Sequence, residues 1–178
     1  MTETAAHAAT LISGKIVDVP DFPQPGVVFK DLTPLFADGP AFQAVVDAIV
    51  EHYRGDFDVV VGMEARGFVI ASAVAYAAGV GVVPVRKAGK LPRPTYSASY
   101  ALEYGEATLQ VHQDAFIAGQ RVLVIDDVLA TGGTAEATAT LIRQAGGLVQ
   151  GLCVLVELGF LGGRGRLADV PVTALLTI

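Results

Sequence analysis

A turn rich in glycine and threonine follows two neighbouring aspartates, Asp126 and Asp127, in the second half of the chain. The turn consists of Ala130, Thr131, Gly132, Gly133 and Thr134. Backbone N–H groups and hydroxyls at such a turn, placed at the start of a helix, can surround a phosphate group. The two carboxylates before it can accept hydrogen bonds from adjacent hydroxyls of a sugar. Together these residues predict a site for a ribose phosphate.

Several glycine-containing segments of the chain have other possible interpretations. A bare Gly132-Gly133 pair is more typical of a tight strand-to-helix turn, and only the complete string favours phosphate binding. Lys15 and Lys90 each follow a glycine but lack the serine or threonine that an ATP-binding P-loop requires after the lysine. Residues 163–168 match a dinucleotide fingerprint formally, but only ten residues follow, too few for that fold.

The elements that must position this turn alternate between two hydrophobic patterns. Short valine-rich runs predict strands that are covered on both faces, and three-four spacing or alanine-rich composition predicts helices. The expected strands are 57–62, 80–85, 121–126 and 152–156, and the expected helices are 40–53, 66–78 and 134–145. Strand and helix in alternation predict an α/β fold with a mostly parallel sheet and helices on both faces.

Two segments do not fit the core pattern. Residues 21–26 contain two prolines and a glycine, and residues 86–105 form a long polar stretch with lysines, arginines, two prolines and three tyrosines. A loop of that length in a compact domain is usually functional or disordered. The basic cluster is equally typical of a solvated loop, but an anionic substrate favours a mobile flap over the site.

Composition limits the classes of function. The chain has 178 residues, the length of one domain spanning 1–178, and 52% of them are hydrophobic. A net charge of −6 gives no broad attraction to nucleic acid or to an anionic membrane. Neither a signal peptide nor a membrane-spanning run is apparent, and Cys153 is expected to be a buried thiol. We therefore expect a cytoplasmic protein.

Four ordered motifs carry a resemblance to a known family. The string VLVIDDVLATGGTA, residues 122–135, resembles the phosphoribosyl-pyrophosphate signature of type I phosphoribosyltransferases. Three further segments narrow the resemblance to the adenine phosphoribosyltransferase family: residues 21–31, residues 64–68, and residues 86–92 with 102–105. The resemblance extends from about Val19 to the carboxyl end. The resemblance implies the type I phosphoribosyltransferase fold, a small hood near 19–36 and a flexible flap over 86–105.

The resemblance also implies an activity. Members of the family transfer the 5-phosphoribosyl group from phosphoribosyl pyrophosphate to adenine, which yields AMP and pyrophosphate with Mg²⁺ as cofactor. On this chain it places the 5′-phosphate on 130–134, the ribose hydroxyls on Asp126 and Asp127, and pyrophosphate on Arg66 and Lys87. The Mg²⁺ ion would be bound mainly through substrate, without a metal site on the protein. A homodimer with small-molecule substrates is expected, and no nucleic-acid or membrane partner.

For the base, the resemblance implies that adenine lies between Phe29 and Val128 and is read by main-chain groups near Val28 and Lys30. Family members often carry arginine where Lys30 stands, and a backbone contact would tolerate the change. Glu103 would handle the proton at the imidazole edge of the purine when the flap closes.

Simpler interpretations remain for two of these side chains. By its position alone, Glu103 is an ordinary exposed acid in a loop. An arginine in the first turn of a helix, such as Arg66, commonly does no more than expose its charge to solvent at the helix end. Two alternatives for function also remain open. The base could be hypoxanthine, guanine or xanthine, or the chain could be a non-catalytic regulator that senses phosphoribosyl pyrophosphate on the same fold.

Overall fold

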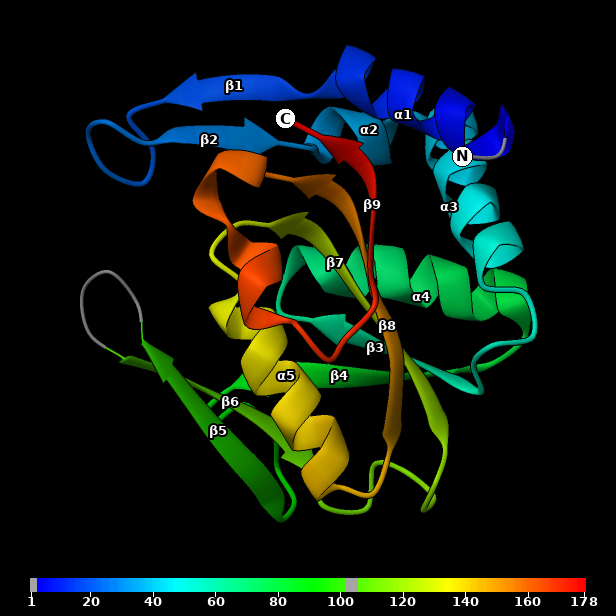
Figure 1. Cartoon of the computed structure of the whole chain (residues 1–178), viewed down its shortest axis with the longest axis vertical. Helices are drawn as coiled ribbons and strands as arrows, with labels where there is room; N and C mark the ends of the chain where they lie inside the picture. Colours follow the sequence, from blue (N-terminus) through cyan, green and yellow to red (C-terminus); the bar gives the residue numbers. More distant parts are fainter. Residues whose placement is uncertain (1–2, 102–105) are drawn as a thin grey trace.

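A twisted sheet forms the centre of the molecule in the computed structural model, which describes residues 3–101 and 106–178 (Figure 1). Within these residues the sheet has seven strands in the order β5-β6-β4-β3-β7-β8-β9. Their bounds are β3 Val59–Met63, β4 Gly81–Lys87, β5 Thr95–Ala101, β6 Glu106–His112, β7 Arg121–Leu129, β8 Leu148–Glu157 and β9 Val172–Thr177. The five strands from β4 to β9 are parallel neighbours, and β6 pairs antiparallel with β4 and β5. The predicted α/β fold is confirmed.

Helices cover both faces of this sheet (Figure 1). They are α1 Glu3–Lys15, α2 Thr33–Ala37, α3 Gly39–His52, α4 Arg66–Ala78 and α5 Gly133–Gln144, with short 3₁₀ helices η1 Gly159–Leu161 and η2 Gly163–Arg166. Local signals fix some of the ends. The Asp38 side chain accepts a hydrogen bond from Ala41 N (3.1 Å) at the start of α3, and Gly79, with φ of 70°, ends α4.

The core is divided by the sheet into two layers. Alternate side chains of a strand point to opposite faces, so Val60 packs in the layer with α1, α3 and α4, whereas Val59 and Val61 pack in the layer with α5. All five residues of β3 are buried. The prediction of a strand that is covered on both faces is confirmed for β3. It is wrong for β4, where Val82 is 43% exposed.

A separate antiparallel hairpin forms the hood. Strands β1 Val17–Pro20 and β2 Val28–Asp31 pair with each other and not with the main sheet. Figure 1 shows this hairpin at the end of the molecule to which the arrowhead of β8 points, and its β2 shares a cavity with residues 126–128 of β7. Parallel α/β sheets commonly bind ligands in the crevice outside the carboxyl ends of the strands, and the hood lies over that edge.

The predicted loop over 86–105 is wrong for Thr95–Ala101, which forms strand β5 and pairs with β6. The physical reason is a period-two pattern in this polar stretch. Tyr96, Ala98 and Tyr100 pack against the buried layer of α5, while the residues between them face outward. The movement of the segment as a flap stays a prediction, and Glu103 lies outside the described residues.

No helix in the described part of the chain is both long and apolar enough to cross a membrane.

Candidate active site

A cavity of about 440 Å³ lies between the hood, the carboxyl ends of the central strands and the first turn of α4. It brings together residues that are about a hundred positions apart in the sequence. Those of its lining residues that the sequence predicts are Val28, Phe29, Lys30, Arg66, Lys87, Asp126, Asp127, Val128, Ala130 and Thr134. Ten of the predicted site residues therefore face one cavity.

The predicted phosphate turn borders this cavity and a smaller one of about 80 Å³ that shares four lining residues with it. Thr131 and Gly132 line the smaller cavity. Gly132 has a φ of 84°, a left-handed conformation that favours glycine, and α5 begins at Gly133. The first N–H groups of a helix have no partner within the helix. Groups of this kind at the start of a helix can bind an anion.

The two acids differ in their surroundings. Asp127 is only 4% exposed, and its Oδ2 lies 2.7 Å from Nε of Arg66 without accepting a hydrogen bond of good geometry. Asp126 Oδ1 accepts a hydrogen bond from the N–H of Asp127 (2.9 Å). Burial, followed by the negative charge of Asp127, raises the pKa of the Asp126 carboxyl well above its usual range.

Arg66 is the first residue of α4 and reaches across the cavity toward the hood. Its guanidinium lies 4.6 Å from the ring centroid of Phe29, in cation–π contact, and its Nε faces Asp127. A Cβ on the next residue, Gly67, would lie 2.8 Å from Asp126 Oδ1. Only glycine allows the start of α4 to come so close to the acids.

Lys87 is placed by an acid that the sequence analysis did not select. Its backbone N–H donates to Glu64 Oε2 (2.9 Å), and Arg86 Nε lies 3.4 Å from the same oxygen. Glu64 follows β3 and also lines the cavity. It therefore joins the end of β3 to the end of β4 beside the predicted pyrophosphate site.

In the hood, the side chain of Lys30 is paired with an acid of the neighbouring strand. Its Nζ lies 2.7 and 2.8 Å from the two carboxylate oxygens of Asp18 on β1. Phe29 is packed edge-on by Phe22, with ring centroids 5.1 Å apart. The main chain of β2, the ring of Phe29 and the side chain of Val128 are left to form the apolar end of the cavity.

The cavity contains several residues that the sequence analysis missed. They are Val27, Glu64, Ala65, Tyr100, Leu109, Leu158 and Leu161. Leu158 could have been found by position, because it follows the buried run of β8 at the same edge as Asp127. Leu161 lies in a glycine-rich turn with no pattern that indicates a site. Gly133 lines neither cavity, because the ring of Tyr100 covers it.

No group of three histidine, cysteine, aspartate or glutamate side chains suited to a metal ion occurs within residues 3–101 and 106–178.

Comparison with known proteins gives matches to a family, to curated relatives and to solved structures. The phosphoribosyl transferase domain family matches residues 36–169. The adenine phosphoribosyltransferase of Salinispora tropica is 70% identical over 177 residues, which cover 99% of this chain and 94% of the relative. Among solved structures, the adenine phosphoribosyltransferase of Thermoanaerobacter pseudethanolicus superposes with a TM-score of 0.93 at 44% identity, covering 96% of this chain and 99% of its own.

The adenine phosphoribosyltransferase of Saccharomyces cerevisiae, complexed with adenine and an imino-altritol bisphosphate, gives a TM-score of 0.92 at 38% identity, covering 96% and 99% of the two chains. The family that the four motifs predict is thus confirmed over nearly the whole length. By its sequence, its fold and the cavity at the edge of its sheet, the chain belongs to the adenine phosphoribosyltransferase family.

Proposed function

We propose that this enzyme transfers the 5-phosphoribosyl group of phosphoribosyl pyrophosphate to adenine and forms AMP and pyrophosphate, a purine-salvage reaction. The observation that carries the proposal is the set of groups that meet at one cavity and at a smaller one that shares four lining residues with it. The turn Thr131–Thr134 at the start of α5, the two acids Asp126 and Asp127, and the apolar side chains of Phe29 and Val128 line these cavities. They suit the phosphate, the ribose and the base of AMP.

The sheet side of the cavity would hold the part common to substrate and product. The amides of the turn and the start of α5 receive the 5′-phosphate, because helix starts favour negative charge. Asp126 and Asp127 accept hydrogen bonds from the two ribose hydroxyls. A ribose bound in this way would direct its C1 carbon toward the hood, where the base binds.

Pyrophosphate would leave toward the cations Arg66 and Lys87. As the bond from C1 to the pyrophosphate oxygen breaks, negative charge grows on the leaving group, and positive side chains stabilise it. Arg66 must then exchange its contact with Asp127 for the substrate. That ion pair has no hydrogen bond of good geometry, which favours the exchange.

Mg²⁺ fits this donor set as an ion carried by the substrate. The acids that face the cavity provide the hard oxygen ligands that Mg²⁺ prefers, but the described residues do not form a complete cage. When bound, the ion would neutralise part of the pyrophosphate charge. Asp126 and Asp127 are the residues that would hold it, together with oxygens of the substrate.

Adenine would enter the slot between Phe29 and Val128. Backbone groups of β2 near Val28 and Lys30 read its edge, and the Asp18 contact keeps the Lys30 side chain out of the way. An imidazole nitrogen of adenine forms the new bond to C1. The proton that this imidazole loses passes to the carboxylate of Glu103, which lies outside the described residues.

One assay tests the function. The protein is incubated with phosphoribosyl pyrophosphate, Mg²⁺ and each purine base in turn, and nucleotide formation is followed by chromatography. Formation of AMP with adenine, and little product with hypoxanthine, guanine or xanthine, is the expected result. Product with another base but not with adenine would replace the proposed substrate. No product with any base would favour the non-catalytic regulator.

We also propose that the enzyme works as a homodimer in the cytoplasm. Exposed apolar side chains at Val69 and Tyr76 on α4 and at Val82 on β4 offer material for an interface. Burial raises the pKa of the Cys153 thiol to about 12, which leaves it unreactive. Sedimentation velocity at micromolar protein tests the dimer.

A further inference from the structure

The phosphate turn rests on a carboxyl-terminal segment, residues 157–164, that has no motif of its own. Gly163 is buried at the start of η2, directly behind the turn. A Cβ built on Gly163 would overlap the carbonyl oxygen of Ala130 and lie 2.9 Å from the N atom of Gly132. A Cβ on Gly132 would in turn overlap the carbonyl oxygen of Gly163. The two backbones are in direct contact because both residues are glycine.

The turn has a second contact. A Cβ on Gly133 would lie 2.9 Å from Cδ2 of Tyr100, on strand β5. The turn is therefore contacted by the side chain of Tyr100 and by the backbone of Gly163. The Tyr100 ring can rotate or withdraw, whereas a backbone contact cannot yield without moving the segment itself.

An ion pair fixes that segment to the sheet. Arg164 donates to both carboxylate oxygens of Glu157, from Nε (3.0 Å) and from Nη2 (2.5 Å), and its Nη1 donates to the carbonyl oxygen of Val172 (2.6 Å). Glu157 is the last residue of β8 and is only 7% exposed. Hydrogen bonds to Glu157 raise the pKa of Arg164. A bidentate pair of this kind fixes orientation as well as distance.

The same segment also lines the cavity. The N–H of Leu158 donates to the carbonyl oxygen of Leu129 (2.9 Å), just before the turn, and Leu158 and Leu161 line the cavity. A displacement of residues 157–164 would thus move the floor of the phosphate site directly. Misplacement of a binding group by about 1 Å can reduce the rate of an enzyme about 100-fold.

We infer that Gly163 and the Arg164–Glu157 pair are positioning residues for the phosphate-binding turn, although neither touches substrate. The inference depends on the proposed function, because it assigns the 5′-phosphate to that turn. It adds a second part of the chain, outside the signature of residues 122–135, to the determinants of phosphoribosyl-pyrophosphate binding.

The test compares Gly163→Ala with Gly165→Ala, two residues along, where a Cβ meets nothing within 4 Å. For each variant, kcat, the KM for phosphoribosyl pyrophosphate and the Ki of ribose 5-phosphate are measured, with the melting temperature as a check of folding. Gly163→Ala should raise this KM and this Ki at least about tenfold, and Gly165→Ala should leave both unchanged. Wild-type KM and Ki in folded Gly163→Ala would overturn the inference.

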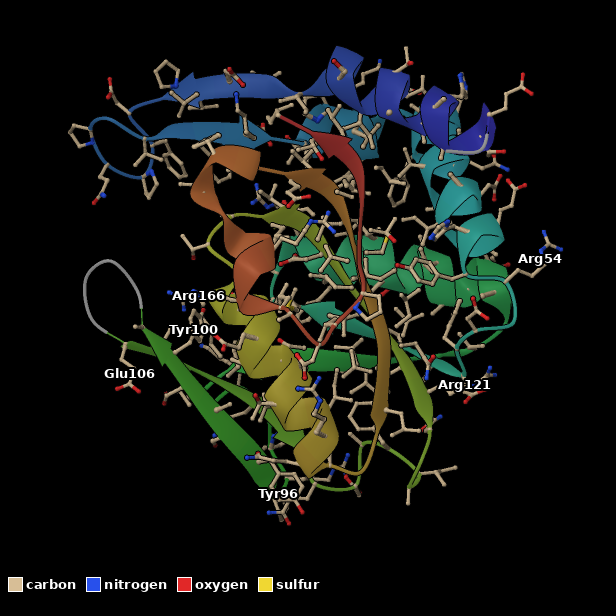
Figure 2. All side chains as sticks on the ribbon, in the orientation of Figure 1. Arg54, Tyr96, Tyr100, Glu106, Arg121 and Arg166 are labelled. Carbon is tan, nitrogen blue, oxygen red and sulfur yellow. The ribbon has the colours of Figure 1, made fainter. Side chains whose placement is uncertain are left out.

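A second pair keeps the test valid if Gly163→Ala does not fold. Arg164→Lys keeps the charge beside buried Glu157 but loses the bidentate geometry, and Arg166→Lys is its control. Nη1 of Arg166 lies 3.7 Å from Oε2 of Glu136. Figure 2 shows Arg166 beside Tyr100, at the outside of α5. Arg164→Lys should raise the KM for phosphoribosyl pyrophosphate more than it lowers kcat.

A fall in kcat alone, or equal values for Arg164→Lys and Arg166→Lys, would show that the pair does not position the turn. The two failures are distinguishable. Absence of AMP formation by the wild-type enzyme contradicts the proposed function, whereas wild-type activity with unaltered variants contradicts only the inference.

Discussion

The two ends of the cavity are built in different ways. The phosphate end, residues 126–134, continues a central strand into a helix, and it contains Asp127 at 4% exposure and buried Gly133. The base end is the hood strand β2, which pairs only with β1 and whose Val28 is 50% exposed. One end is part of the core, and the other is a two-stranded hairpin laid over it.

This difference suggests a division of labour. A turn locked into the core binds the phosphoribosyl group in one geometry, as a reaction at C1 requires. A two-stranded hairpin has marginal stability of its own and can adjust to admit a flat base. Substitutions at the phosphate end should therefore affect activity and stability together, whereas those at the base end should affect stability less.

The largest effect is expected from Glu103→Gln, with Glu106→Gln as control. Loss of the proton acceptor should lower kcat about 100-fold or more and leave the KM for phosphoribosyl pyrophosphate and the melting temperature unchanged. Glu106 begins β6, and Figure 2 shows its side chain pointing away from the molecule. Unchanged turnover in Glu103→Gln, measured by steady-state kinetics, would remove Glu103 from the mechanism.

Gly132→Ala and Gly26→Ala compare the two ends most directly. Both glycines have positive φ, 84° and 87°, so alanine is strained by about 1 kcal/mol at either. Only Gly132 also meets Gly163, since a Cβ on Gly26 meets no atom of the described residues within 4 Å. Gly132→Ala should lower kcat/KM for phosphoribosyl pyrophosphate about 100-fold and lower the melting temperature further than Gly26→Ala does. Equal effects would contradict the division.

Phe29→Ala tests the base end by itself. Loss of an aromatic face stacked on a base costs about 1 to 3 kcal/mol, so the KM for adenine should rise about tenfold, with phosphoribosyl pyrophosphate binding retained. Phe22→Ala is the control, because Phe22 touches Phe29 but does not line the cavity. A similar rise in both variants would mean that the hood acts through its fold and not through the ring of Phe29.

The smallest effect concerns stability at the phosphate end. Because burial raises the pKa of Asp126, the folded state binds its proton more tightly than the unfolded state does. The contribution of Asp126 to stability is then greatest at low pH, and it falls as pH rises from the usual value of 3.8 through the raised pKa. Asp126→Asn removes this loss and should stabilise the protein at pH 7 by about 1 kcal/mol, or about 2 to 4 °C. Weaker phosphoribosyl pyrophosphate binding should accompany it, and a lower melting temperature would refute the assignment.

How far the sequence predicts the molecule depends on how local the signal is. The strand, acids, turn and helix of 121–145 are contiguous, so spacing alone indicates their arrangement. Helix α4 is predicted over its full length because Gly79 marks its end. Helix α1 was not predicted, since only Ala8 and Ile12 are buried along it and its hydrophobic face is weak.

The missed parts of the site depend on contacts between distant segments. Gly163 matters because it has no side chain, and no pattern in the sequence distinguishes it from the other glycines of this chain. The sequence also gives no signal for Glu64, because its role depends on the ends of β3 and β4 lying side by side in the fold. The sequence of strand β5 indicates a loop instead, because its inward side chains are tyrosines and alanine within a polar stretch.

The most direct test of the whole account is a crystal structure of the enzyme with AMP. We predict the phosphate on the amides of Thr131–Thr134, the ribose hydroxyls on Asp126 and Asp127, and adenine against Phe29. Density for the phosphate anywhere else, with those amides still free of ligand, would contradict it.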